Sequence, residues 1–360
     1  MKFIDEYRNR ELCDLLVAEI IETVDRPIRL MEVCGTHTMA ISRNGIREML
    51  PPQITLISGP GCPVCVTAQS DIDRCIELAQ VENVIITTFG DLMRVPGGDT
   101  NLQSIRAQGA DVRMVYSTLD CLAIAEREPE KQVVFLGVGF ETTAPTVAAA
   151  ILQARQRSIH NFSVLSMHKI VPPALHALMQ HPDVTVDGFI CPGHVSVIIG
   201  ANAYLPIVTQ YHVPCVITGF EPADILDGIL KITQQLQKQT TRVDVSYRRA
   251  VFPDGNKRAV DVMFQVFEIV DTDWRGIGMI PGSGLKINSN YQEYDASLRF
   301  KLSPPKAMKA TGCRCGDILI GKLIPPDCRL FASRCNPQHP IGPCMVSSEG
   351  TCAAYYKYHR

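Results

Sequence analysis

The stretch IRLMEVCGTHT, residues 28–38, joins a buried-type apolar run to a cysteine, a glycine and a histidine. The same rhythm, an apolar run followed by a turn and a more helical segment, recurs along the chain. The further runs are QITLIS (53–58), NVIITTF (83–89), DVRMVYS (111–117), KQVVFLGV (131–138), FSVLSM (162–167), VDGFICP (186–192) and CVITGF (215–220). Short buried runs that alternate with helical segments predict parallel strands joined by crossover helices, which is an α/β fold.

The rhythm divides the chain into two similar parallel-sheet α/β domains, expected at residues 1–127 and 128–240, and a different carboxyl-terminal domain at 241–360. Between 242 and 302, alternating stretches such as RVDVSYRRAVF and VMFQVFEIV predict antiparallel strands. From 313 to 352 the chain has six cysteines and few long apolar runs. Because such a segment buries little apolar surface, we expect a bound metal to order it and the third domain to be α+β.

Composition limits the classes of partner. The 360 residues carry a net charge of −2, which gives no long-range field to attract nucleic acid or anionic lipid. No stretch approaches the roughly 20 apolar residues that span a bilayer, and the first residues lack the apolar run of a signal peptide. We therefore expect a cytoplasmic protein with no nucleic-acid or membrane partner. In a reducing compartment, fourteen cysteines indicate metal or redox chemistry better than structural bridges.

The tail cysteines have an unusual spacing. They are Cys313, Cys315, Cys328, Cys335, Cys344 and Cys352. The tail lacks the paired CxxC half-sites of zinc ribbons and the compact CxxCxxC run of bacterial ferredoxins. Thiolates on widely separated loops are compatible with an isolated cubane iron–sulfur cluster, and structural zinc is the alternative.

A second group of chemically active residues follows the strands, at the edge where open α/β sheets bind ligands. Its members are Cys34, His37, Cys62, Cys65, Glu141, Thr142, His168, Cys191 and His194. Cys34 and His37 share one face of an expected helix start, where the helix dipole favours a thiolate. The pair suits Fe(II) or zinc. A nucleophilic Cys–His pair and a buried structural pair are the alternatives.

GPGCPVC, residues 59–65, places Cys62 and Cys65 at the i,i+3 spacing that permits a disulfide. The alternative is half of a zinc site that Cys34 and His37 complete. CPGH repeats the thiol–imidazole spacing with Cys191 and His194, and we expect the two copies to face each other across a cleft between the domains.

GVGFETT, residues 137–143, lacks the GK[ST] of a P-loop and the third glycine of a dinucleotide fingerprint. It predicts a tight turn and a helix cap, with Glu141 as a candidate functional carboxylate. The remaining cysteines sit singly among apolar residues and are expected to behave as small core hydrophobes; they are Cys13, Cys75, Cys121 and Cys215.

Taken together, these motifs resemble the HypD family of [NiFe]-hydrogenase maturation proteins. The matching segments are FIDEYR, MEVCGTHT, GPGCPVCV, TFGDLMRVPG, GADVRMVYS, FLGVGFETTAPT, CPGHVS, GFEPADIL and MVSSEGTCAAYYKY, in this order along nearly the whole chain. The resemblance implies two similar α/β domains and a cluster-bearing carboxyl-terminal domain.

It also implies a function. Such proteins help to assemble the Fe(CN)₂CO group of the hydrogenase active site with a HypC-type chaperone and a HypE-type cyanide carrier, and through the chaperone they meet the hydrogenase large subunit. By similarity, Cys34 binds the Fe(II) that carries CN and CO, and Cys62 and Cys65 are a thiol pair that cycles with a disulfide and touches the iron when reduced. The tail holds a [4Fe–4S] cluster through Cys315, Cys328, Cys335 and Cys352. Cys313 and Cys344 fall outside this set, and exchange of electrons or thiols with the cluster is one role open to them.

The sequence leaves three hypotheses for the function of the protein. The first is a redox-active assembly scaffold rather than a conventional turnover enzyme. The second is a stand-alone iron–sulfur thiol–disulfide oxidoreductase, and the third is a zinc-stabilised interaction module. Infrared bands of bound CN and CO, turnover of generic disulfides, and metal analysis separate the three.

Overall fold

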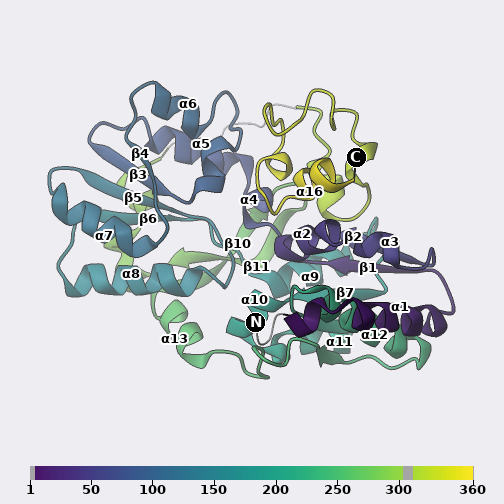
Figure 1. Cartoon of the computed structure of the whole chain (residues 1–360). Helices are drawn as coiled ribbons and strands as arrows, with labels where there is room; N and C mark the ends of the chain where they lie inside the picture. Colours follow the sequence, from purple (N-terminus) through teal and green to yellow (C-terminus); the bar gives the residue numbers. More distant parts are fainter. Residues whose placement is uncertain (1–4, 303–310, 360) are drawn as a thin grey trace.

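The computed structural model describes residues 5–302 and 311–359. The first two residues of the FIDEYR motif (3–8) lie outside these ranges. Two parallel sheets form two α/β bodies, an antiparallel ribbon lies between them, and the cysteine-rich tail covers one end of the first body (Figure 1). The α/β class and the pair of parallel sheets predicted from the sequence are confirmed.

The first sheet has the strand order β2-β1-β7-β8-β9, with every pair parallel. Its strands are β1 (Ile28–Glu32), β2 (Ile54–Ser58), β7 (Gly188–Pro192), β8 (Cys215–Thr218) and β9 (Val243–Val245). One face packs on α1 (Arg10–Thr23), α2 (Gly35–Arg43), α3 (Ile46–Met49) and α12 (Pro222–Gln237). The other face packs on α9 (Val171–Gln180), α10 (Gly193–Ile199), η3 (Ala201–Tyr204) and α11 (Leu205–Tyr211). Because both faces are covered, every residue of β7 and β8 is buried, and so are all but one residue of β1 and of β2.

The second sheet has the order β4-β3-β5-β6 and is also parallel. Its strands are β3 (Val84–Thr88), β4 (Val112–Met114), β5 (Gln132–Gly137) and β6 (Phe162–Ser166). Helices α5 (Gln69–Leu78) and α6 (Leu102–Ala107) cover one face, and α7 (Thr118–Arg127) and α8 (Ala144–Gln156) cover the other. The shorter elements of the chain are η1 (Asp5–Arg8), α4 (Pro63–Val66), η2 (Gly90–Arg94), η4 (Ser289–Tyr294) and α14 (Ala296–Arg299).

The sequence rhythm suggested that each sheet is built from one continuous half of the chain, and this expectation was wrong. The chain forms β1 and β2, builds all of the second sheet, and then returns to add β7, β8 and β9 beside β1. The boundary expected between residues 127 and 128 falls between β4 and β5, which belong to one sheet. The reason is that strand pairing depends on contacts distant in sequence, which a local rhythm does not contain.

The ribbon consists of β10 (Phe267–Trp274) and β11 (Gly278–Ile287), which pair antiparallel as expected. The flanking expectations need correction. Residues 243–245 form a parallel edge strand of the first sheet, and residues 257–266 form α13 (Lys257–Val266). Met263 and Val266, three residues apart, are the buried positions of α13, which packs on α8. This spacing is helical, and it overrides the strand-like composition.

The tail, as far as residues 311–359 describe it, contains short helices and no strand of a sheet. In the third domain expected at 241–360, the β10–β11 ribbon supplies the strands that the α+β class requires, and its iron–sulfur character stays a prediction. Its helices are α15 (Cys315–Leu319), η5 (Pro325–Asp327), η6 (Pro343–Met345) and α16 (Thr351–Tyr358). Its cysteines are continuous with the buried core that runs between the two sheets. Within the described ranges, no helix is both long and apolar enough to cross a membrane.

Candidate functional site

Two helices of the first sheet begin with a cysteine. Cys34 follows β1 as the N-cap of α2, and Cys62 follows β2 as the N-cap of α4. Since β1 and β2 are parallel neighbours, their carboxyl ends lie side by side and bring the two motifs together.

Gly61 is the point of closest approach. A Cβ atom added at Gly61 would lie 2.1 Å from the Cys34 backbone nitrogen, and the Gly35 N–H donates to the Gly61 carbonyl at 2.9 Å. Only glycine permits this contact, so the glycine turn of GPGCPVC presses the CPVC segment against Cys34.

Cys62 and Cys65 are joined by a disulfide in the structure, with their Cα atoms 5.2 Å apart. Pro63 occupies the first helical position, where its missing N–H breaks no hydrogen bond. Both cysteines are buried, at 3% and 0% exposure. The reversibility of this bond stays a prediction.

The position of Cys34 at a helix start predicted a thiolate, but its surroundings in the structure favour the protonated thiol. The pKa of the Cys34 thiol is raised to about 12, chiefly by burial and to a lesser extent by Glu349 and Glu32, while the backbone N–H groups of His37 and Thr36 act to lower it. Desolvation therefore outweighs the helix dipole, and free Cys34 is a protonated thiol at neutral pH. A bound metal cation would displace this proton, because metal ligation needs the thiolate.

Glu32 and Glu349 are site residues that the sequence patterns missed. Glu32 is fully buried at the end of β1, where it accepts hydrogen bonds from the Cys34 backbone N–H and the Thr38 hydroxyl. Burial raises the pKa of Glu32 to about 7. Glu349 reaches the site from the tail and accepts a 2.8 Å hydrogen bond from the Thr36 hydroxyl. The only signal for these two residues in the sequence was that Glu32 lies inside the motif MEVCGTHT and Glu349 inside the motif MVSSEGTCAAYYKY.

His37 is fully buried, and its Nε2 lies 2.9 Å from both the Gly219 carbonyl oxygen and the Thr218 hydroxyl. Burial lowers the pKa of His37 to about 4, so the ring is neutral at pH 7. With Nε2 bonded to the carbonyl as donor, Nδ1 carries the lone pair, and this buried atom has no hydrogen-bond partner. His37 could therefore accept a proton or ligate a metal.

The CPGH copy is arranged differently from the facing pair that we expected. Cys191 is fully buried in β7, where its thiol interacts with that of Cys215, and burial raises the pKa of Cys191. His194 is exposed at the start of α10. Phe220 lies between the two histidines, with ring centroids 4.8 Å from His37 and 4.1 Å from His194. Only the imidazole of this motif reaches the Cys34 region.

Glu141 and His168 belong to the second sheet. Glu141 follows β5, and its buried Oε1 accepts from the Val171 N–H at 2.9 Å while Oε2 has no partner. Burial raises the pKa of Glu141 to about 7. His168 is buried and hydrogen-bonded through Nδ1 to the Ser166 hydroxyl at 3.0 Å. In the described part of the chain, no hydrogen bond joins either residue to Cys34, Cys62 or Cys65. Thr143 begins α8 without a side-chain cap bond.

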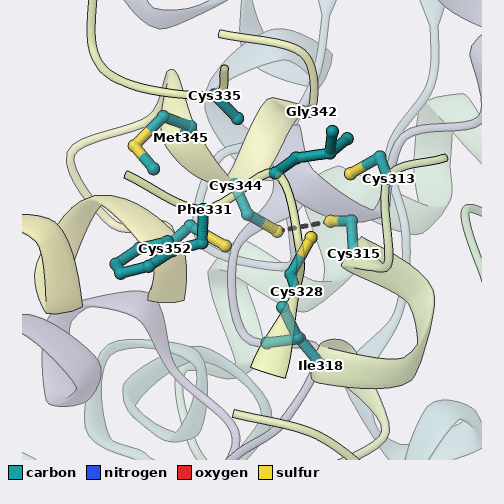
Figure 2. A pocket seen from close by; sticks show the side chains of 11 residues that line it. Cys313, Cys315, Ile318, Cys328, Phe331, Cys335, Gly342, Cys344, Met345 and Cys352 are labelled. Carbon is teal, nitrogen blue, oxygen red and sulfur yellow. Dashed lines mark hydrogen bonds between the residues drawn. The ribbon is translucent and has the colours of Figure 1, made fainter. Parts of the chain in front are cut away.

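All six tail cysteines line one cavity (Figure 2). The other side chains that line it are apolar and come from Ile318, Leu330, Phe331 and Met345. A pocket of thiols with apolar walls fits an iron–sulfur cluster, whose ligands are cysteine thiolates and whose surroundings exclude water. In the described ranges, no three His, Cys, Asp or Glu side chains are grouped as the ligands of a single metal ion.

The six thiols are not equivalent. The Cys315 and Cys344 sulfurs lie 2.6 Å apart, which Figure 2 marks with a dashed line. Cys313 is partly exposed, whereas the other five are buried. Cys344, which was outside the predicted ligand set, is therefore in contact with Cys315, a predicted cluster ligand.

The tail joins the two groups of cysteines. Helix α4, which carries Cys65, packs against η6, which carries Cys344, and α16 packs against α2. Gly35 leaves room for Glu349, since an added Cβ would lie 2.4 Å from the Glu349 Cβ. The Ser347 hydroxyl donates to Asp91 in η2 at 2.8 Å, so the same loop also contacts the second body.

The fold and site define a class: an α/β protein in which three buried cysteines, Cys34, Cys62 and Cys65, lie next to a tail whose cavity is lined by cysteines. A sequence model for HypD, described as the hydrogenase formation hypA family, matches residues 11–359. The chain is 44% identical to hydrogenase maturation factor HypD of Escherichia coli, with 100% of this chain and 99% of that protein covered. It is also 44% identical to hydrogenase expression/formation protein HupD of Azotobacter chroococcum, with 100% and 97% covered. The chain belongs to the HypD family of hydrogenase maturation factors, and the resemblance seen in the sequence is confirmed.

Proposed function

We propose that this maturation factor is a redox-active scaffold on which the Fe(CN)₂CO group of [NiFe]-hydrogenase is assembled in the cytoplasm. The observation that carries the proposal is the contact between the two cysteine motifs and the tail: Cys34 touches the CPVC turn, and the CPVC helix packs on the segment of Cys344. The iron, a substrate here, is bound by Cys34 together with a cysteine of a HypC-type chaperone. A HypE-type carrier supplies cyanide, and the chaperone hands the product to the hydrogenase large subunit.

The residues around Cys34 prepare it for iron. Glu32 holds the Cys34 backbone through the N–H group, and Thr36, bonded to Glu349, fixes the first turn of α2. The neutral His37 presents an unpartnered Nδ1 that orients the substrate or accepts the thiol proton. Cys62 and Cys65 lie next to this site, where reduction of their disulfide gives two further thiols.

A [4Fe–4S] cluster bound in the tail would supply electrons one at a time. The ligands proposed from the family spacing are Cys315, Cys328, Cys335 and Cys352. The 2.6 Å contact of Cys315 with Cys344 favours a second set, in which Cys313 replaces Cys315 and the paired thiols stay free.

A stand-alone oxidoreductase is less well supported. Cys62 and Cys65 are at most 3% exposed, so the disulfide of a second folded protein does not reach them. A scaffold that receives small ligands needs no such access.

The function is tested by anaerobic purification with the chaperone, followed by infrared and metal analysis. The wild-type complex should show bands of bound CN and CO. Cys34→Ala should lose these bands and keep the iron and sulfide of the tail, because its side chain is outside the tail cavity. Unchanged bands in this variant would move the iron site away from Cys34.

The ligand sets are distinguished by two single variants. If Cys315 is a ligand, Cys315→Ala should lose the cubane electron paramagnetic resonance signal and Cys313→Ala should keep it. If Cys313 is the ligand instead, Cys313→Ala should lose the signal and Cys315→Ala should keep it. Cys328→Ala, which both sets require, is the positive control, and a signal that survives in it contradicts both.

A further inference from the structure

The turn of the β10–β11 ribbon lies between the CPVC helix and the tail cysteines. Thr67, just after α4, forms an antiparallel bridge with Trp274 at the end of β10. On its other side the turn meets the tail, since a Cβ added at Gly276 would lie 2.2 Å from the Cα of Gly316. Gly316 is the neighbour of Cys315. The turn therefore touches both cysteine groups.

Arg275 sits in this turn and is attached by two hydrogen bonds to the end of the CPVC helix and by a third to Gln69, the first residue of α5. Its backbone N–H donates to the Val66 carbonyl at 2.9 Å, its Nε donates to the Thr67 carbonyl at 2.8 Å, and its Nη1 donates to the Gln69 Oε1 at 2.9 Å. Carbonyls at the end of a helix lack intrahelical partners, and an arginine satisfies them.

The remaining nitrogen of Arg275 is unused. Nη2 is buried and has no hydrogen-bond partner. The charge of the guanidinium lies within electrostatic range of the thiols of Cys313, Cys315 and Cys344, and also of the carboxylates of Asp71 and Asp73. A buried cation needs compensating anions, because desolvation without them is expensive, and the tail sulfur site would share this role with the two carboxylates when it is negatively charged.

We propose that Arg275 is a positioning residue that holds the CPVC helix against the tail and stabilises the more negative, reduced state of the tail sulfur site. The inference rests on the proposed function, because the tail sulfur site that it concerns is the cluster. One-electron reduction of a cluster adds a negative charge beside a fixed cation in a site of low dielectric, so the reduced state would gain more from Arg275 than the oxidised state.

The test uses the full-length chain and four proteins: wild type, Arg275→Gln, Arg275→Lys and Arg157→Gln. Arg275→Gln removes the charge, and Arg275→Lys keeps it. Arg157→Gln is the matched control, because it removes an equal charge from a surface pair with Glu126. The first readout is the midpoint potential of the reconstituted cluster in an anaerobic dye titration. The second is the glutathione ratio at which the Cys315–Cys344 pair of iron-free protein is half reduced, where two glutathione molecules supply the two electrons.

Arg275→Gln should weaken reduction of the cluster about tenfold, a potential about 59 mV more negative for one electron. Reduction of an iron-free Cys315–Cys344 disulfide takes up two protons with the two electrons and leaves neutral thiols, so Arg275→Gln should leave the glutathione ratio within about threefold of wild type. Arg275→Lys and Arg157→Gln should stay within about threefold of wild type in both readouts. A wild-type cluster potential for Arg275→Gln, or an equal shift in the Arg157 control, overturns the proposal.

Two outcomes are separated in advance. If wild type takes up no cluster, the proposed cofactor fails and the charge role of Arg275 fails with it; if the cluster is present and Arg275→Gln keeps the wild-type potential, only the role of Arg275 fails. If Arg275→Gln does not fold, Arg275→Met, which also removes the charge, replaces it and should show the same tenfold shift, and a wild-type potential in it overturns the charge argument. Gln69→Leu removes the Nη1 bond and keeps the charge, so it should retain the wild-type potential, and a tenfold shift in it would assign the effect to packing.

Discussion

Cys34 stands at the start of a helix, a position that favours thiolate, yet its thiol is only 8% exposed and its pKa is raised to about 12. The same conflict between position and burial affects other ionisable groups after the strands. Glu32 and Glu141 have raised pKa values and His37 has a lowered one, each because the charged form is desolvated. In the apo protein each shift therefore favours the neutral form of the group.

Glu141 gives a prediction at this scale. Its pKa rises from 4.5 when unfolded to about 7 when folded. Between these values the folded state binds more protons, so stability due to the neutral carboxyl is present below pH 4.5 and is lost as pH rises to 7. Glu141→Gln, which stays neutral, should gain about 3 kcal/mol relative to wild type between pH 4.5 and pH 7.

The measurement is the free energy of unfolding by urea at several pH values. Glu130→Gln, at an exposed position, is the matched control and should show no such trend. A constant difference between Glu141→Gln and wild type across this range would contradict the burial argument.

At the scale of elements, the turn before α4 gives a second prediction. Gly61→Ala should destabilise the protein by about 1–3 kcal/mol, because its Cβ would lie 2.1 Å from the Cys34 nitrogen and the backbone must move. The displacement should also separate the two thiol motifs. Urea unfolding measures the loss.

Gly90→Ala is the control for this change. Its added Cβ would lie 3.6 Å from the nearest atom, the sulfur of Met114, which is an ordinary contact. Equal stability of the two variants would show that the CPVC turn can move away from Cys34 without cost.

Strand positions were predictable, whereas strand partners were not. Each apolar run named from the sequence contains one strand, because burial on both faces leaves a continuous apolar signal. The pairing of β1 with β7 has no local signal. The candidate site divides in the same way: the thiols of Cys34, Cys62 and Cys65 follow from motifs, but the contacts of Glu349 and Arg275 arise only when distant segments meet.

At the scale of the whole molecule, the tail is the part that depends on a bound group. Residues 311–359 contain short helices joined by irregular segments, and six cysteines line their cavity. Removal of iron from a loaded protein should therefore speed hydrogen exchange in α16 and around the cavity by about tenfold or more, because metal binding supplies folding free energy.

Amides of β1 and β5 serve as the internal reference for this experiment. These strands are central in their sheets and should exchange at unchanged rates after iron removal. Equal protection of the tail with and without iron would mean that packing alone orders it.

The return of the chain to the first sheet has a consequence for synthesis on the ribosome. Leu30 pairs with Gly188, a separation of 158 residues (188 − 30), so β1 has no partner on that side until much later in translation. At about 5–20 residues per second, this delay is roughly 8–30 s. The second body can fold during that time, and the Cys34 motif waits beside it, open to solvent, until β7 emerges. A nascent chain in this interval exposes the thiols that the finished protein buries.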